Sequence, residues 1–215
     1  MCGRFALVSD AAAISETFAL RDSSYDFKPN WNITPGQYIP AVIHRGGRNS
    51  LASFLWGLVP SWAKDPSIGH KLINARAETI DKKPSFRNAF SKRRCLIVAD
   101  GFYEWKKEGA KKIPIYFHLK SKEPFGLAGL YETWMSPDKR EIQSCTIITT
   151  EANKLIAPIH DRMPVIVPKK QELIWISDAA EDRAMLLSIL KPYPAEEMDY
   201  EIGMGPRFAQ VKEGV

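Results

Sequence analysis

The 215-residue sequence lacks the features that mark secreted, membrane-spanning and zinc-binding proteins. It has only three cysteines, at positions 2, 95 and 145, and an odd count does not predict a disulfide framework. No apolar run approaches the roughly 18 residues of a membrane-spanning helix, and the N-terminus has no apolar stretch typical of a signal peptide. No CxxC or HxxxH spacing predicts a zinc site. We therefore expect an intracellular protein in a reducing compartment, with no metal and no cofactor.

The charge that the sequence does carry is unevenly spread. The 30 basic and 25 acidic residues give a formal net charge of +5. Residues 61–120 hold 14 Lys/Arg and 6 Asp/Glu, whereas residues 171–215 hold 4 and 9. A basic segment of this kind is either a polyanion-binding face or ordinary solvated surface, and composition alone favours the second.

Short apolar runs rich in Val, Ile, Phe, Tyr and Trp, bounded by Gly, Pro, Asn or Asp, predict strands through most of the chain. The predicted strands are residues 38–43, 51–56, 95–105, 114–119, 125–134, 144–149 and 164–167. The lysine-rich stretch 106–112 lies between two of these runs and predicts a hairpin tip.

Helices are predicted only at the periphery. They are expected after the capping pair Ser9-Asp10, over residues 169–176, and over residues 179–190 with Met185, Leu186, Ile189 and Leu190 on one side. Strands that dominate without alternating βαβ order indicate an α+β protein with a mostly antiparallel, closed or sandwiched sheet. We expect a single domain over residues 1–215.

Cys2 has distinctive chemistry if Met1 is removed, and methionine removal generally tolerates a small second residue. The cysteine then has a thiol with an ordinary pKa of about 8.5 and an α-amine with one of about 7.7–8.0. Both groups are therefore expected to have usable nucleophilic fractions at neutral pH. Such an aminothiol condenses with an aldehyde to an imine, which the thiol closes to a thiazolidine. The alternative is a small residue at a frayed terminus.

Three other segments have side chains capable of polar chemistry. Asn74 can orient a nucleophile, and Arg76 can bind a phosphate unless it forms a surface ion pair with Glu78. Glu104 lies among aromatic residues: facing inward it is expected to have a raised pKa and to act as an acid or base, whereas facing outward it is a surface residue. Among four histidines, His160 alone has a charged, turn-like setting that suits a proton carrier.

Four tryptophans lie close to basic residues or polar turns: Trp31, Trp56, Trp62 and Trp105. Aromatic rings beside cations stack nucleobases and neutralise phosphates, although most tryptophans belong to the core. We predict that Trp56 is a core residue and that Trp62 is an exposed stacking platform or wedge. The cysteines at 95 and 145 lie in apolar runs and are predicted to be core residues.

Six segments, taken together and in chain order, closely resemble the SRAP family (SOS response-associated peptidase domain). They are MCGRF at 1–5, WNITPG at 31–36, WGLVPSW at 56–62, INARAET at 73–79, ADGFYEWKK at 99–107 and IHDRMP at 159–164. The resemblance implies a barrel-like SRAP fold with a positively charged groove for single-stranded DNA. It implies a protein of DNA damage repair in the cytoplasm and nucleoid.

The activity that the resemblance implies is the sensing and covalent trapping of abasic sites in single-stranded DNA. The ring-opened sugar presents an aldehyde, and Cys2 supplies both nucleophiles for a thiazolidine crosslink. Asn74 holds the cysteine and the sugar, Glu104 positions or deprotonates the amine, and His160 shuttles protons. The imine stage implies AP-lyase activity, and the peptidase label fits self-removal of Met1.

The resemblance also implies a set of DNA contacts made by a monomer. The implied DNA-binding residues are Arg4, Pro35, Trp62, Arg76, Thr149 and Arg162. The arginines would bind phosphates beside the lesion, the proline and the tryptophan would wedge against bases, and the threonine would touch the backbone. Contacts of this kind read no bases, so little sequence specificity is expected.

Two segments depart from the family pattern. The chain diverges from about residue 200, so the C-terminal strand is expected to be altered or missing. Ala63 stands where some members have a second tryptophan, which predicts a smaller wedge. Two rival functions remain open: a thiol peptidase that uses Cys2, His160 and Asn74, and a non-covalent single-stranded DNA-binding protein.

Overall fold

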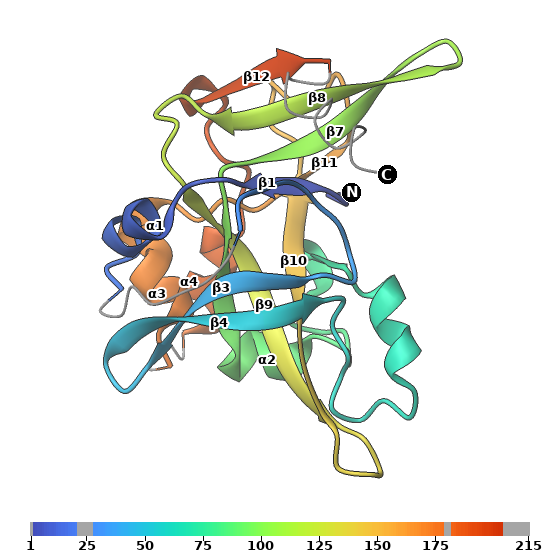
Figure 1. Cartoon of the computed structure of the whole chain (residues 1–215), viewed down its shortest axis with the longest axis vertical. Coiled ribbons are helices and arrows are strands. Elements are labelled where there is room, and N and C mark those ends of the chain that lie inside the picture. Colours follow the sequence, from blue (N-terminus) through green and yellow to red (C-terminus); the bar gives the residue numbers. More distant parts are fainter. Residues whose placement is uncertain (1, 21–27, 179–181, 204–215) are drawn as a thin grey trace.

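The computed structural model describes residues 2–20, 28–178 and 182–203 of the chain. In this part of the chain the strands form two sheets, with short helices at their periphery (Figure 1). The α-helices are α1 (Ala11–Thr17), α2 (Arg87–Lys92), α3 (Glu172–Ile176) and α4 (Arg183–Ile189). Short 3₁₀ helices lie at Pro66–Lys71, Ala77–Thr79, Lys169–Gln171 and Ala195–Glu197. No helix in these residues is long and apolar enough to cross a membrane.

The larger sheet closes into a five-stranded barrel. Its strands are β3 (Tyr38–Arg45), β4 (Arg48–Trp56), β6 (Arg94–Ala99), β9 (Phe125–Met135) and β10 (Glu141–Glu151). They pair in the order β10-β4-β3-β6-β9, and β9 pairs back onto β10, so that the ring is complete. Only the β4–β10 pairing is parallel within this ring. The short strands β5 (Asn74–Arg76) and β11 (Arg162–Pro164) both pair with the end of β10.

The second sheet is antiparallel and lies above the barrel in Figure 1. Its strands, in spatial order, are β12 (Met198–Ile202), β8 (Lys111–Leu119), β7 (Gly101–Glu108), β1 (Phe5–Leu7) and β2 (Asn30–Ile33). One hydrophobic core joins the two sheets, and Phe5 of β1 packs against Trp56 of β4 with ring centroids 5.3 Å apart. The α+β, mostly antiparallel and barrel-like prediction is therefore confirmed, whereas the single domain over 1–215 stays a prediction.

The strand predicted over residues 95–105 is wrong in one respect, because it is two strands that belong to different sheets. The chain bends at Asp100, where β6 of the barrel ends and β7 of the second sheet begins. The Asp100 carboxylate accepts hydrogen bonds from the backbone N–H of Val8 and of Ser9, and from the Ser9 hydroxyl. The bend is thereby tied to the segment that follows β1.

Other predicted elements are found with shifted ends. The hairpin tip is present, but β7 and β8 extend into it as far as Glu108 and Lys111. The helix α1 has Asp10 rather than Ser9 as its N-cap, with Ala13 N–H donating to the Asp10 carboxylate over 2.8 Å. The 3₁₀ turn and α3 cover the helix predicted at 169–176.

At the C-terminal end, part of the prediction falls outside the described residues. Helix α4 begins at Arg183, and the preceding residues 179–181 are not described. Met185 was expected on the apolar side, but it is exposed, since α4 has barely two turns and its buried residues are Leu186 and Ile189. A C-terminal strand is not missing, because β12 pairs with β8 over five residues, whereas residues 204–215 are not described.

Asp100→Ala is expected to lower the free energy of unfolding by about 2–4 kcal/mol, since two backbone N–H groups and a hydroxyl lose the buried carboxylate that accepts their hydrogen bonds. Urea unfolding monitored by tryptophan fluorescence measures this loss. Asp138→Ala is the control, because Asp138 is an exposed carboxylate at a hairpin turn. Equal losses in the two variants would contradict the role given to Asp100.

Candidate functional site

The site forms where four segments distant in the sequence meet. Cys2 precedes β1, Asn74 begins β5, Glu104 lies in β7, and His160 lies in the loop between β10 and β11. The pairing of β1 with β7 and of β5 with β10 determines these positions. Asn74 Nδ2 donates to the carbonyl oxygen of Cys2 over 2.9 Å, so the predicted neighbours are in direct contact.

Glu104 faces inward, which settles the choice between the two orientations. Its exposed fraction is 3%, whereas the neighbouring Trp105 is half-buried on the opposite face of β7. Burial raises the pKa of the Glu104 carboxyl above its ordinary value, and the charge of His160 opposes part of this rise. A carboxyl with a raised pKa can exchange protons closer to neutrality than an exposed one, as the sequence predicted.

The thiol of Cys2 does not have the ordinary pKa that the sequence suggested. Cys2 is fully buried, and this burial, together with the nearby charge of Glu104, raises its thiol pKa to about 12. Burial therefore strongly disfavours the thiolate in the chain that retains Met1. The usable thiolate fraction expected after removal of Met1 stays a prediction.

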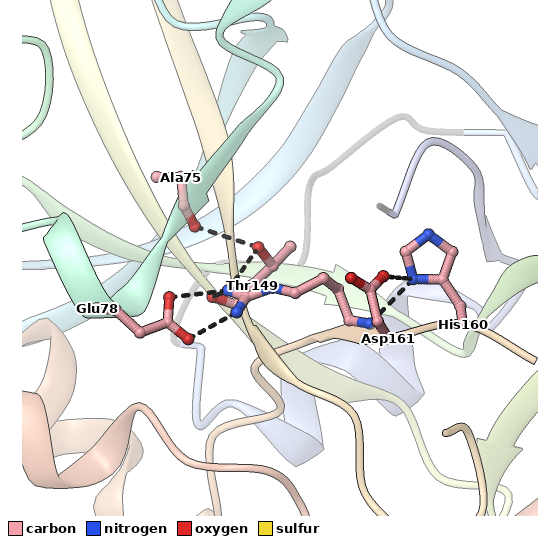
Figure 2. Close-up of polar contacts among 6 residues, drawn as sticks. Ala75, Glu78, Thr149, His160 and Asp161 are labelled. Atoms are coloured by element: carbon pink, nitrogen blue, oxygen red, sulfur yellow. Dashed lines mark hydrogen bonds and ion pairs between the residues drawn. The ribbon is translucent and has the colours of Figure 1, made fainter. Parts of the chain in front are cut away.

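His160 makes contacts that suit two protonation states (Figure 2). Its Nδ1 lies 2.9 Å from the backbone nitrogen of Arg162 and 2.9 Å from Asp161 Oδ1. When Nδ1 accepts from the Arg162 N–H, the proton of the neutral ring is on Nε2; when the ring is charged, Nδ1 donates to Asp161. The loop thus offers a partner to the ring before and after it takes up a proton.

Arg162 forms a fork of hydrogen bonds to Glu78 and Thr149, both of which are labelled in Figure 2. Its Nη1 and Nη2 donate to the two Glu78 carboxylate oxygens over 2.6 and 3.0 Å, and Nη2 also donates to the Thr149 carbonyl over 2.6 Å. These hydrogen bonds lower the pKa of Glu78. The ion pair considered between Arg76 and Glu78 is wrong, since Glu78 pairs with an arginine that is 84 residues away.

The predicted DNA contacts differ in how accessible they are. Arg76 and Trp62 are exposed, and 55% of the Trp62 surface is accessible, so its predicted exposure is confirmed. Pro35 is half-buried in the turn between β2 and β3. Thr149 is fully buried, and its hydroxyl lies 3.4 Å from the carbonyl of Ala75, beneath the Arg162 fork.

Three predicted core residues are found in the core, and two neighbours of the site were not predicted. Trp56 and both cysteines at 95 and 145 are buried in the core, as predicted. The guanidinium of Arg4 lies 5.2 Å above the Trp105 ring. Sequence reasoning missed Glu78 and Asp161 as neighbours of the site. Their positions inside the INARAET and IHDRMP segments were the only available signal.

The part of the chain that the structure describes holds no group of three or more His, Cys, Asp or Glu suited to a metal ion. The polar groups of the site are instead a thiol, an amide, a carboxyl and an imidazole. Together they can hold a small carbonyl compound, exchange its protons and offer a nucleophile.

Comparison with known proteins shows matches along most of the chain. The family model of SOS response associated peptidase (SRAP) matches residues 1–202. The abasic site processing protein YoqW of Bacillus subtilis (strain 168) is 46% identical over 202 residues, covering 93% of this chain and 90% of YoqW. The abasic site processing protein YedK of Escherichia coli K12 is 32% identical over 183 residues, covering 82% and 79%. A crystal structure from Bacteroides thetaiotaomicron superposes with a TM-score of 0.87 at 28% identity, covering 97% and 94%.

Glu104→Gln is expected to be more stable than the wild type by a margin that grows with pH. Because the folded-state pKa of Glu104 is raised, the folded protein binds more protons than the unfolded chain between the ordinary and the raised pKa. The wild type therefore loses stability as pH rises through that window, and Gln removes the loss. Urea unfolding of both proteins from about pH 4 to pH 8 measures the margin. A margin that does not change with pH would contradict the raised pKa.

Proposed function

The chain belongs to the SOS response associated peptidase (SRAP) family, and we propose that it traps abasic sites in single-stranded DNA covalently through Cys2. The names of its relatives support abasic-site processing as the general role. The observation that supports the covalent step is the placement of Cys2 itself. Asn74 contacts Cys2, the charge of Glu104 acts on its thiol, and His160 acts on Glu104 in turn.

The proposed reaction joins one aldehyde to one aminothiol. Removal of Met1 frees the α-amine of Cys2, which adds to the aldehyde carbon of the ring-opened abasic sugar. The resulting carbinolamine loses water and becomes an imine. The thiol of Cys2 then adds to the imine carbon, its proton ends on the ring nitrogen, and a thiazolidine is formed. One water is released overall, and no oxidant or reductant is required.

The buried polar groups have distinct roles in these steps. Glu104, whose pKa is raised by burial, takes a proton from the attacking amine near neutral pH. His160 delivers a proton to the departing hydroxyl and is charged or neutral with a partner in either state. The raised thiol pKa favours attack by the amine first, followed by ring closure when a base lies beside the thiol. β-Elimination from the imine would give AP-lyase activity: a proton leaves the carbon next to the imine, and the phosphate leaves the following carbon.

Binding of the strand is proposed to use the arginines around the site. Arg76 is exposed and therefore accessible to a phosphate. Arg162 can bind a phosphate only if the phosphate replaces the Glu78 carboxylate. Glu78 thus occupies the anion position when DNA is absent. Trp62 and Pro35 are proposed to wedge against bases, and Thr149 supports Arg162 from below.

Two other functions use part of the same site. A thiol peptidase would need Cys2 as a thiolate, and the raised pKa of its buried thiol weighs against it. A non-covalent single-stranded DNA-binding protein would not need the buried Glu104 carboxyl, whose burial is energetically costly.

Cys2→Ala is expected to abolish the covalent band when the protein lacking Met1 is mixed with abasic single-stranded DNA and resolved on a denaturing gel. Asn74→Ala and His160→Ala should slow its formation by roughly 10²-fold. Cys95→Ala is the control, since it removes a buried thiol from the barrel and should keep the band. A band formed by Cys2→Ala, cleavage of added peptides by the wild type, or binding without any band would each overturn the proposal.

The non-covalent affinity of Cys2→Ala for the same DNA is expected to fall steeply with salt. Three arginine–phosphate contacts predict a slope of about −2 in log K against log salt, since each contact on a single strand contributes about −0.7. Fluorescence anisotropy at several salt concentrations measures it. Affinity that does not depend on salt would contradict the arginine contacts.

A further inference from the structure

The hairpin formed by β7 and β8 projects from the second sheet, well beyond the site. Figure 1 shows its tip at the opposite end of the molecule from the tip of the β9–β10 hairpin. The tip has four exposed lysines and a single acid, which are Lys106, Lys107, Lys111, Lys112 and Glu108. The site chemistry described above uses none of them.

The register of the hairpin sets two lysines directly against each other. Glu108 lies opposite Lys111, and Lys106 Nζ lies 2.7 Å from Glu108 Oε1, so these two lysines share one acidic partner. Lys107, by contrast, lies opposite Lys112 on the other face of the hairpin. No ion pair involving either of these two lysines is found in the described residues. Like charges that face each other across a strand pair are destabilising, and an anion bound between them removes the repulsion.

The face of β7 that carries Lys107 is opposite the one that carries Glu104, and it is connected to the site through Arg4. Alternation along the strand places Tyr103, Trp105 and Lys107 on one face, with about 6.7 Å between successive members. Trp105 is half-buried and has Arg4 above its ring, and Arg4 is two residues from Cys2. Cations and aromatic rings therefore alternate along this face, as they do in grooves that bind single strands.

Trp31 lies in β2 and extends this surface beyond β1. It packs against a small cluster of Ala6, Tyr103 and Tyr116, separate from the main core, with its ring edge-on to Tyr116 at 6.0 Å. Trp31 is half-buried, so part of its ring remains accessible. We refer to Arg4, Trp31, Trp105, Lys107 and Lys112 as the outer track.

We propose that the outer track binds the DNA strand beyond the abasic site, with a backbone phosphate between Lys107 and Lys112. The inference rests on the proposed function, because it takes the trapped strand as the occupant. The charge of the lysine pair and its continuity with Arg4 support a nucleic acid rather than a neutral ligand. The outer track lengthens the segment of the DNA strand that is bound and takes no part in the proposed reaction.

The test compares short and long abasic oligonucleotides, of about 5 and about 20 nucleotides, because single-strand sites span about 4–16 nucleotides. Binding is measured in the Cys2→Ala background for Lys107→Gln/Lys112→Gln. On the long oligonucleotide we expect an affinity loss of about fivefold or more, and a salt slope smaller by about 0.7, because one phosphate contact is lost. The loss should be confined to the long oligonucleotide. The matched control is Lys139→Gln/Arg140→Gln in the loop that connects β9 and β10, which should bind like the parent.

The outcomes separate this inference from the function on which it rests. If protein with Cys2 intact gives no covalent band on the short oligonucleotide, the proposed function fails, whatever the lysines do. If the band forms but the two lysine substitutions leave long-strand affinity and salt slope unchanged, the outer track is refuted. Weakened binding of polyglutamate with unchanged DNA binding would indicate an acidic protein partner and would also refute it. Folding is checked by urea unfolding, where the double variant should be no less stable than the parent because the repulsion is gone.

Discussion

The arrangement of the two sheets depends on one carboxylate, at the point where the chain passes from one sheet to the other. Asp100 lies where the chain leaves the barrel and enters the second sheet, and it accepts hydrogen bonds from Val8 and Ser9. These bonds tie the end of β1 to the start of β7. Because β1 and β7 are neighbours, Cys2 lies beside Glu104 at the junction of the sheets. Without this anchor, the cysteine would be positioned by a three-residue strand, by the packing of Phe5 and by the hydrogen bond from Asn74.

Burial of ionisable groups in the site costs folding free energy, and the proposed chemistry depends on that burial. A carboxyl and a thiol are both buried where their charged forms are disfavoured, so neither group is stabilised as an anion. The buried Glu104 carboxyl lowers stability as pH rises above its ordinary pKa, but it can exchange protons closer to neutrality than an exposed carboxyl does. The contacts of Asn74 and His160 supply the hydrogen bonds that hold the neighbouring atoms in place.

The sequence predicted the strands well because each has a local signature of β-branched and aromatic residues between turn formers. For the candidate site, a raised pKa was one of the two outcomes expected of Glu104, and it is found, whereas the chemical roles of Cys2, Asn74 and His160 stay predictions. It could not predict the Arg162–Glu78 fork, because the partners come from β11 and from the turn after β5 and meet only when both strands pair with β10. Nor could it predict the thiol pKa of Cys2, because burial depends on how the two sheets pack. The split of residues 95–105 was missed because the apolar pattern continues through Asp100.

The central claim is that one residue supplies both bonds to the lesion. It is tested most directly by mass spectrometry of the crosslinked protein after nuclease digestion and proteolysis, with iodoacetamide added to label free thiols. The account predicts an adduct on the N-terminal peptide that begins with Cys2, formed with loss of one water and with its thiol protected from alkylation. An adduct on any other peptide, or a Cys2 adduct whose thiol is still alkylated, would contradict it.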